Sequence, residues 1–229
     1  YYDKEYPKRL LSIDDFPILL HVKGNIDNLN KFKSIAIVGT RNPIQHSIGF
    51  SKNFGSYFSQ KGFLIVSGLA LGCDTEAHKG CLKVGGKTIA VLAQGLGENE
   101  IMPRRNIKLV KEILENDGCL ISEYPLGQKP SNAYYIRRNR IQSGLSESTI
   151  VIETDEKGGT MHTAKFCLKQ KRILACLKPP EEKYLNAFKG NKILIEENHA
   201  FVLENLIDAE SLINKIKFNT EVHNQQLSF

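Results

Sequence analysis

The 229-residue sequence lacks a long hydrophobic run, and it lacks the cysteine patterns that hold metal ions. No apolar segment approaches the roughly 18–20 residues that a membrane-spanning helix needs, which argues against a membrane protein. The first residues, Tyr1–Glu5, show no basic region followed by an apolar stretch, so no secretory signal peptide is visible. The five cysteines form no CxxC pair and have no zinc-ligand spacing, which predicts free thiols, no bound metal and a cytoplasmic location.

Common catalytic and nucleotide-binding motifs are also missing. There is no GxSxG and no HExxH, so hydrolysis by a serine nucleophile or by a zinc ion has no candidate residues. No GxGxxG follows the strand predicted at residues 34–38, which argues against an ordinary NAD site. The stretch Cys81–Thr88 resembles the end of a Walker A motif, but it has Cys81 where the first glycine belongs and it precedes a strand. We therefore predict no cofactor.

What the sequence does contain is the composition of a folded protein. Apolar residues make up 41% and charged residues 24%, which excludes disorder as the dominant state. The 31 Lys and Arg residues exceed the 25 Asp and Glu residues and give a formal charge of +6. This excess permits a polyanionic partner but does not demand one.

Short apolar runs alternate with amphipathic stretches along most of the chain. Several runs are apolar at consecutive positions, as expected of strands that are covered on both faces. The predicted strands are 34–38, 63–67, 88–92, 119–122, 149–152, 173–177 and 200–203, and the predicted helices are 49–61, 75–84, 106–116, 160–170 and 208–216. This alternation predicts an α/β fold with an open, mostly parallel sheet and helices on both faces.

One main domain is expected, because no internal repeat or low-complexity linker divides the chain. Residues 1–33 precede the first predicted strand and are expected to form an N-terminal extension packed on the main domain, which spans residues 34–217. Residues 218–229, rich in Asn and Gln, are expected to form a frayed C-terminal tail.

Glycine-bearing loops follow three of the predicted strands, at the sheet edge where open α/β proteins bind ligands. They contain Gly39–Arg41, Ser67–Gly68 and Lys157–Thr160, and the last of these opens a helix. Glycines at a helix start with a lysine beside them favour an anion, because backbone N–H groups and the helix dipole face it. For any one loop, glycines that serve only a tight turn are an equal alternative. Three such loops at one edge favour binding.

The densest basic cluster is Tyr134–Arg140, in which three arginines lie within four residues beside two tyrosines. Arginines next to an aromatic ring combine phosphate contacts with a platform on which a base can stack. The alternative is a solvated helix start whose tyrosines belong to the core. Arg104 and Arg105 form a weaker patch that is expected on a solvated face.

Together these segments resemble the DprA/Smf family of DNA-processing proteins. The resemblance runs from about residue 6 to 205 and rests on an ordered set of short motifs, which include Ile37–Arg41, Val66–Asp74, Gly86–Leu92, Ser122–Pro125, Arg138–Ser146 and Lys157–Thr160. The chain departs from the family pattern at Tyr135–Arg137, where members often have Phe-Pro, and at Gly158–Thr160, where they have Ser-Gly-Ser.

The resemblance implies an extended Rossmann-like domain that binds single-stranded DNA without catalysis. It further implies a homodimer and a RecA-type recombinase as a possible partner in DNA uptake and recombination. The DNA-binding residues that it implies are Gly39, Thr40, Arg41, Ser67, Gly68, Tyr135, Arg138, Asn139, Arg140, Lys157, Gly158, Gly159 and Thr160.

Three alternative functions stay open. The first is an enzyme of the related lysine-decarboxylase-like phosphoribohydrolases, which use the same fold. Their signature places a glutamate three residues after Gly-Thr; here that position is Thr163. A protein that senses a small nucleotide in the same site, without chemistry, is the second alternative. The third is a DprA-like protein that acts in defence against foreign DNA.

Overall fold

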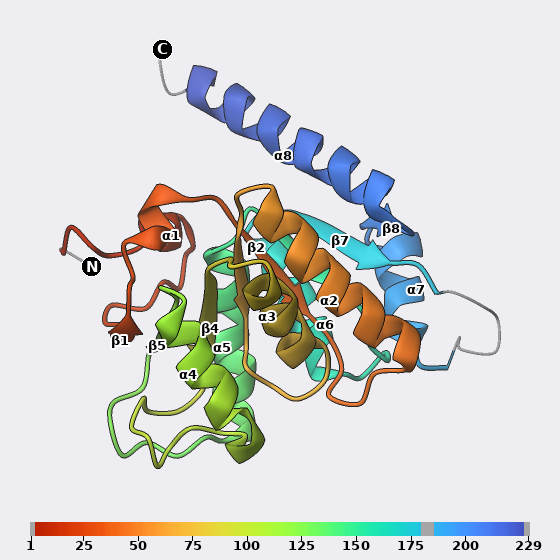
Figure 1. Cartoon of the computed structure of the whole chain (residues 1–229). Coiled ribbons are helices and arrows are strands. Elements are labelled where there is room, and N and C mark those ends of the chain that lie inside the picture. The colour runs from red at the N-terminus through yellow and green to blue at the C-terminus, as the bar shows by residue number, and fades with distance from the viewer. Residues whose placement is uncertain (1–2, 180–185, 227–229) are drawn as a thin grey trace.

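The structure of the protein, a computed structural model, describes residues 3–179 and 186–226 (Figure 1). Its centre is an eight-stranded sheet with the order β1-β5-β4-β3-β2-β6-β7-β8. The strands are β1 (His21–Gly24), β2 (Ser34–Val38), β3 (Leu64–Ser67), β4 (Thr88–Leu92), β5 (Cys119–Ser122), β6 (Ser148–Val151), β7 (Ile173–Leu177) and β8 (Phe201–Leu203). Only β1 pairs antiparallel, with β5, and the other neighbours are parallel. The predicted open, mostly parallel sheet is confirmed.

Helices cover both faces of this sheet, as predicted (Figure 1). The α-helices are α1 (Asn28–Lys31), α2 (Gln45–Gln60), α3 (Cys73–Lys83), α4 (Ile107–Glu115), α5 (Asn132–Gly144), α6 (Gly159–Lys169), α7 (Lys189–Glu196) and α8 (Leu206–Gln226), and two short 3-10 helices are η1 (Lys8–Ser12) and η2 (Arg104–Asn106). Side chains of successive strand residues point to opposite faces, so Ile35 and Ile37 of β2 pack with α2, α3 and α8, whereas Ala36 packs with α5 and the N-terminal segment. Helices α6 and α7 cover the adjoining part of this second face, and α4 lies on the first.

The N-terminal segment departs from its prediction, because the sheet does not begin at residue 34. Residues His21–Gly24 form edge strand β1, in which His21 pairs with Ser122 and Gly24 with Cys119. Its four residues are alternately half-buried and exposed, a pattern too short to stand out from a loop. Residues 1–2 of this segment lie outside the described residues.

The C-terminal end also differs from the expected tail. Helix α8 continues to Gln226, so the boundary expected at residue 217 falls inside it, and its far end projects beyond the sheet (Figure 1). Asn and Gln are tolerated in helix interiors at a cost of a few tenths of a kcal/mol each, roughly, so their abundance did not indicate where the helix stops. Residues 227–229 lie outside the described part of the chain.

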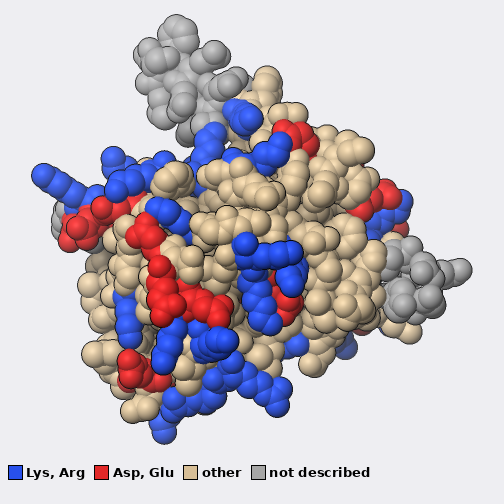
Figure 2. Space-filling model, viewed as in Figure 1, with Lys and Arg blue, Asp and Glu red and all other residues tan. Residues whose placement is uncertain are grey.

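The face that carries α2, α3 and α4 has no continuous basic field. Figure 2 shows Lys and Arg side chains beside Asp and Glu side chains over this face. Any attraction for a polyanion on this face is therefore local.

Within the described residues, no helix is long and apolar enough to cross a membrane, and no group of three or more His, Cys, Asp or Glu side chains is placed to hold a metal ion.

Candidate nucleic-acid interface

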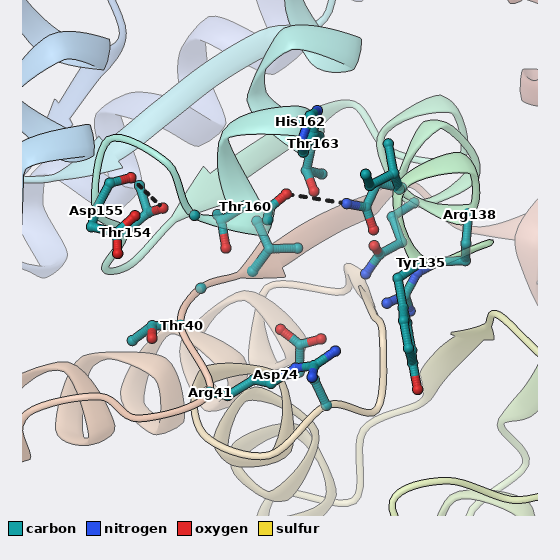
Figure 3. A pocket seen from close by; sticks show the side chains of 18 of the residues that line it. Thr40, Arg41, Asp74, Tyr135, Arg138, Thr154, Asp155, Thr160, His162 and Thr163 are labelled. Carbon is teal, nitrogen blue, oxygen red and sulfur yellow. Dashed lines mark hydrogen bonds between the residues drawn. The ribbon is translucent and has the colours of Figure 1, made fainter. Parts of the chain in front are cut away.

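A cavity of about 530 Å³ opens where the chain reverses its direction of winding across the sheet. From β2 the chain adds β3, β4 and β5 on one side, and then returns to place β6 on the other side of β2. The loops after β2 and β6 therefore diverge, which leaves a crevice at the carboxyl ends of these two strands. Figure 3 shows the cavity between the first turns of α6 on one side and α5 on the other. This switch point is the standard ligand position in open α/β sheets.

Helix α5 supplies one wall of the cavity. It begins at Asn132, where the Ser131 side chain accepts a hydrogen bond from the Tyr134 N–H at 3.2 Å and so caps the helix. Residues 132, 135, 139 and 142 line the cavity, a spacing of three, four and three that matches one helix face. The cap fixes where the helix starts, and this start sets which residues of the cluster face the cavity.

Arg41 and Tyr135 face each other at the cavity mouth. The guanidinium carbon of exposed Arg41 lies 4.9 Å from the centre of the Tyr135 ring, within the range of a cation–π contact (Figure 3). The loop that carries Arg41 is held by Glu153: its backbone carbonyl accepts the Thr40 N–H at 2.8 Å, and its carboxylate accepts the Ile44 N–H at 3.0 Å. The structure thus places the guanidinium of Arg41, on a loop that Glu153 holds by two hydrogen bonds, against the ring of Tyr135.

The opposite wall is the start of α6. Gly158 is the residue before the helix, and among the described residues no side chain caps it. Exposed Lys157 lies next to this helix start, and its backbone N–H donates to Asp155 Oδ1 at 2.9 Å. Uncapped N–H groups, the positive end of the helix dipole and a lysine form a site for an anionic oxygen. An anion site at Lys157–Thr160 stays a prediction, and this helix start is the geometry that supports it.

Arg138 lines the same cavity but its guanidinium is engaged by the protein. It is 5% exposed and donates to the carbonyl oxygens of Gly68, at 2.9 Å, and Val91. Burial disfavours the charged form of both Arg138 and Asp74, so it lowers the pKa of Arg138 and raises the pKa of Asp74. The positive charge of Arg138 opposes the rise of the Asp74 pKa. A Cβ on Gly68 would collide with the Arg138 guanidinium, so this position has room only for glycine. Arg138 holds the β3–α3 loop in place.

The structure brings ten of the thirteen predicted residues to the cavity and leaves three outside its lining. Ser67 donates to the Ile37 carbonyl at 2.6 Å, and Gly68 lies behind Arg138. Arg140 is 3% exposed and pairs with Glu123 at 2.7 Å on a different side of α5. The ten that line the cavity are Gly39, Thr40, Arg41, Tyr135, Arg138, Asn139, Lys157, Gly158, Gly159 and Thr160.

Sequence reasoning missed several lining residues. Asp74, Asn132, Gln142, Thr154, Asp155, His162 and Thr163 also contribute to the wall. For Asn132 and Gln142 a signal existed, because both lie on the Tyr135 face of α5 once this segment is treated as a helix. Thr154 and Asp155 carried no such signal, since their position depends on how the β6–α6 loop folds.

Comparison with known proteins shows which family the chain resembles. The family model described as DNA recombination-mediator protein A matches residues 1–216. The chain is 41% identical to the DNA processing protein DprA of Bacillus subtilis over 169 residues, which cover 74% of this chain and 56% of that protein. It is 38% identical to the protein Smf of Escherichia coli over 206 residues, which cover 88% of this chain and 54% of that protein. The chain spans about half the length of these curated relatives.

Solved structures show the same likeness. The X-ray structure of DprA from Streptococcus pneumoniae has a TM-score of 0.81 and 32% identity, and the match covers 91% of this chain and 71% of that one. DprA from Helicobacter pylori, whose structure is described for its single-stranded DNA binding mode, has a TM-score of 0.82 and 29% identity, with 91% and 93% covered. A molybdenum cofactor binding protein from Rippkaea orientalis, 16% identical with a TM-score of 0.57 and 81% and 97% covered, shares the fold alone.

Proposed function

Since the chain belongs to the DNA recombination-mediator protein A (DprA/Smf) family, we propose that it binds single-stranded DNA in the cavity between α5 and α6. The observation that carries this proposal is the pair of Arg41 and Tyr135 at the cavity mouth, opposite the uncapped start of α6. One wall offers a cation and an aromatic ring, and the other offers backbone N–H groups and Lys157. Proteins that bind single strands combine cationic groups and aromatic rings in this way.

The proposed contacts divide by chemistry. Arg41, Lys157 and the N–H groups of Gly159–Thr160 bind phosphate oxygens, because they are cationic or N–H-donating groups that the cavity leaves accessible. Tyr135 stacks on a base, either beside Arg41 or in its place. Arg138 acts through its hold on Gly68 and Val91, and Arg140 acts through its pair with Glu123, so neither is proposed to contact DNA directly.

We further propose that the protein performs no reaction on the strand. Among the acids that precede the α6 start, Asp155 lines the cavity and accepts the Lys157 N–H through its Oδ1. Glu153 is a second acid that a sugar-cleaving enzyme would need free. It is 3% exposed, and its carboxylate accepts the Ile44 N–H. A carboxylate used to position a loop is a poor candidate for attack or proton transfer. The expected result is no release of base from nucleoside monophosphates by the wild-type protein, and turnover that is lost on Glu153→Gln would contradict it.

Family membership also supports three wider proposals. We propose that the protein works as a homodimer in the cytoplasm, where it hands single-stranded DNA to a RecA-type recombinase during DNA uptake and recombination. All five cysteines are buried free thiols, which fits a reducing compartment. Sedimentation of the protein, and loading of a RecA-type recombinase onto strands coated by it, test the dimer and the recombinase separately.

The binding proposal is tested by titration with labelled oligonucleotides at two salt concentrations. Single strands are expected to bind more tightly than duplexes of equal length, because stacking needs an unpaired base, and more tightly as strands lengthen. Affinity is expected to fall steeply with salt, since each neutralised phosphate releases counterions. Equal affinity for duplex, or stoichiometric binding of a mononucleotide without a gain from length, would contradict the proposal.

A further inference from the structure

The cavity has an exposed, charged mouth, and its buried floor holds neutral polar groups beside Arg138 and Asp74. At the mouth, Arg41, Asn132 and Lys157 are exposed. At the floor, Asn139, Gln142 and Thr163 are 7%, 1% and 2% exposed and carry amide or hydroxyl groups. A strand that places its phosphates at the mouth therefore meets neutral hydrogen-bonding groups deeper in the cavity. In Figure 3, Thr163 of this floor lies on α6, across the cavity from the Tyr135 ring on α5.

Gln142 is a neutral floor residue whose hydrogen bonding is incomplete. Its Nε2 is buried and has no acceptor within the described part of the chain. The neighbouring amide of Asn139, by contrast, donates to the Gly159 carbonyl at 3.3 Å. A buried N–H2 group without an acceptor is unusual in a folded protein, because its desolvation is not compensated. The torsion at the end of a glutamine side chain is soft, so the N–H2 group can turn toward a ligand that supplies an acceptor.

The floor suits a neutral group better than a second phosphate. The Nη1 of Arg138 donates to two backbone carbonyls and its Nε has no partner in the described structure, and the nearby carboxyl of Asp74 opposes the positive charge of the guanidinium. The buried carboxyl of Asp74 also lines the cavity and would repel an anion. A volume of about 530 Å³ falls within the range of roughly 300–1,000 Å³ that small-molecule sites occupy, which accommodates one base with its sugar.

We propose that Gln142 binds the Watson–Crick edge of one unpaired base, which enters the cavity past Tyr135 while its phosphate stays at the mouth. The proposal rests on the single-strand binding proposed above. A primary amide has donors and an acceptor side by side, and each base presents donor and acceptor groups on its Watson–Crick edge. In a duplex that edge is already paired. Gln142 therefore adds a second reason, independent of stacking, for the protein to select single strands.

The test compares three strands of equal length and charge: oligothymidylate, oligo(N3-methylthymidylate) and an abasic strand. Gln142→Met keeps the length of the side chain and removes the amide. It is expected to weaken oligothymidylate about tenfold, the size of one hydrogen bond, and to leave the abasic strand within about twofold. On the wild-type protein, N3-methylation blocks the base edge and is expected to cost about the same tenfold. Gln60→Met, at the exposed end of α2, is the matched control and should leave all three strands unchanged.

Several outcomes would overturn the inference. A Gln142→Met variant that weakens all three strands equally, or none of them, places Gln142 outside base recognition. A wild-type protein that ignores N3-methylation does the same, and this measurement needs no variant. The melting temperature of Gln142→Met should stay equal or rise, since an unpaired amide is removed; a fall would mark a structural role. If Arg41→Ala weakens single-strand binding about ten- to hundredfold in those cases, the proposed function survives and only the role of Gln142 fails.

Discussion

Replacing Arg138 by methionine is expected to destabilise the protein before it affects any ligand. The side chain is buried and holds the loop after β3 to the end of β4 through the carbonyls of Gly68 and Val91. Methionine keeps the length of the side chain but donates no hydrogen bond. Two buried carbonyls then lose their donor, and Asp74 loses the positive charge that opposes the effect of its burial.

The magnitude follows from these contacts. A hydrogen bond to a charged group contributes about 1.5–3 kcal/mol, so the two bonds together are worth about 3–6 kcal/mol. Part of this is offset, because the variant no longer buries a guanidinium whose Nε has no partner in the described structure. The expected net loss is about 3 kcal/mol of the free energy of unfolding. Domains of this kind are stable by only about 5–15 kcal/mol, so the effect is large.

Urea denaturation without DNA measures this loss. Arg137→Met is the matched control on the same helix: Arg137 is exposed and approaches Glu123 at 3.4 Å, so its loss should cost about 1 kcal/mol or less. If Arg138→Met costs no more than Arg137→Met and instead weakens binding of single strands specifically, Arg138 is a direct ligand and the assigned positioning role is wrong.

Three further changes test the structure around the cavity. Gly68→Ala should destabilise the protein, because its Cβ would meet Arg138, whereas Gly49→Ala in α2 meets nothing within 4 Å and should stabilise by about 0.5–1 kcal/mol; urea titration compares them. Burial lowers the pKa of His78 from 6.5 to about 3, so acidification from pH 7 to 5 protonates only the unfolded state and should cost about 2 kcal/mol of stability that His78→Gln does not lose; equal pH slopes would contradict this. Tyr135→Ala should weaken single-strand binding by about 1–3 kcal/mol with little change in its salt dependence, and a changed salt slope would refute stacking.

The sheet was predictable because most of its strands can be recognised individually from their own sequence. Runs such as Ile35–Val38 are apolar at consecutive positions, since helices cover both faces, and they need no tertiary information to be recognised. Edge strand β1 cannot be recognised from its own sequence, because half of its four residues are exposed, and only its pairing with β5 identifies it as a strand. The end of α8 was missed for a related reason: helix propensities differ too little to locate a boundary without packing contacts.

The sequence indicates which loops form the candidate site, but not which way the side chains of the site point. Arg41, Tyr135 and Lys157 were identified from residue type and position, and the structure brings them to one cavity. From the sequence alone, the arginines of α5 were treated as one patch. Residues two apart on a helix, however, are rotated by about 200° about the helix axis and so lie on nearly opposite sides. Arg138 therefore reaches the β3 and β4 carbonyls, and Arg140 reaches Glu123 on another side. Which of these arginines has a buried partner depends on tertiary packing, which no local pattern encodes.

The most direct test of the proposed interface compares Arg41→Ala with Arg105→Ala. Both arginines are exposed, but only Arg41 lines the cavity, where it faces Tyr135. Fluorescence anisotropy with oligothymidylate at several salt concentrations measures affinity and its salt slope, and circular dichroism verifies folding. Arg41→Ala is expected to lose about ten- to hundredfold in affinity and to reduce the salt slope by about one, whereas Arg105→Ala stays within about twofold. Small and equal losses at both positions would mean that diffuse charge binds the strand and that the cavity does not.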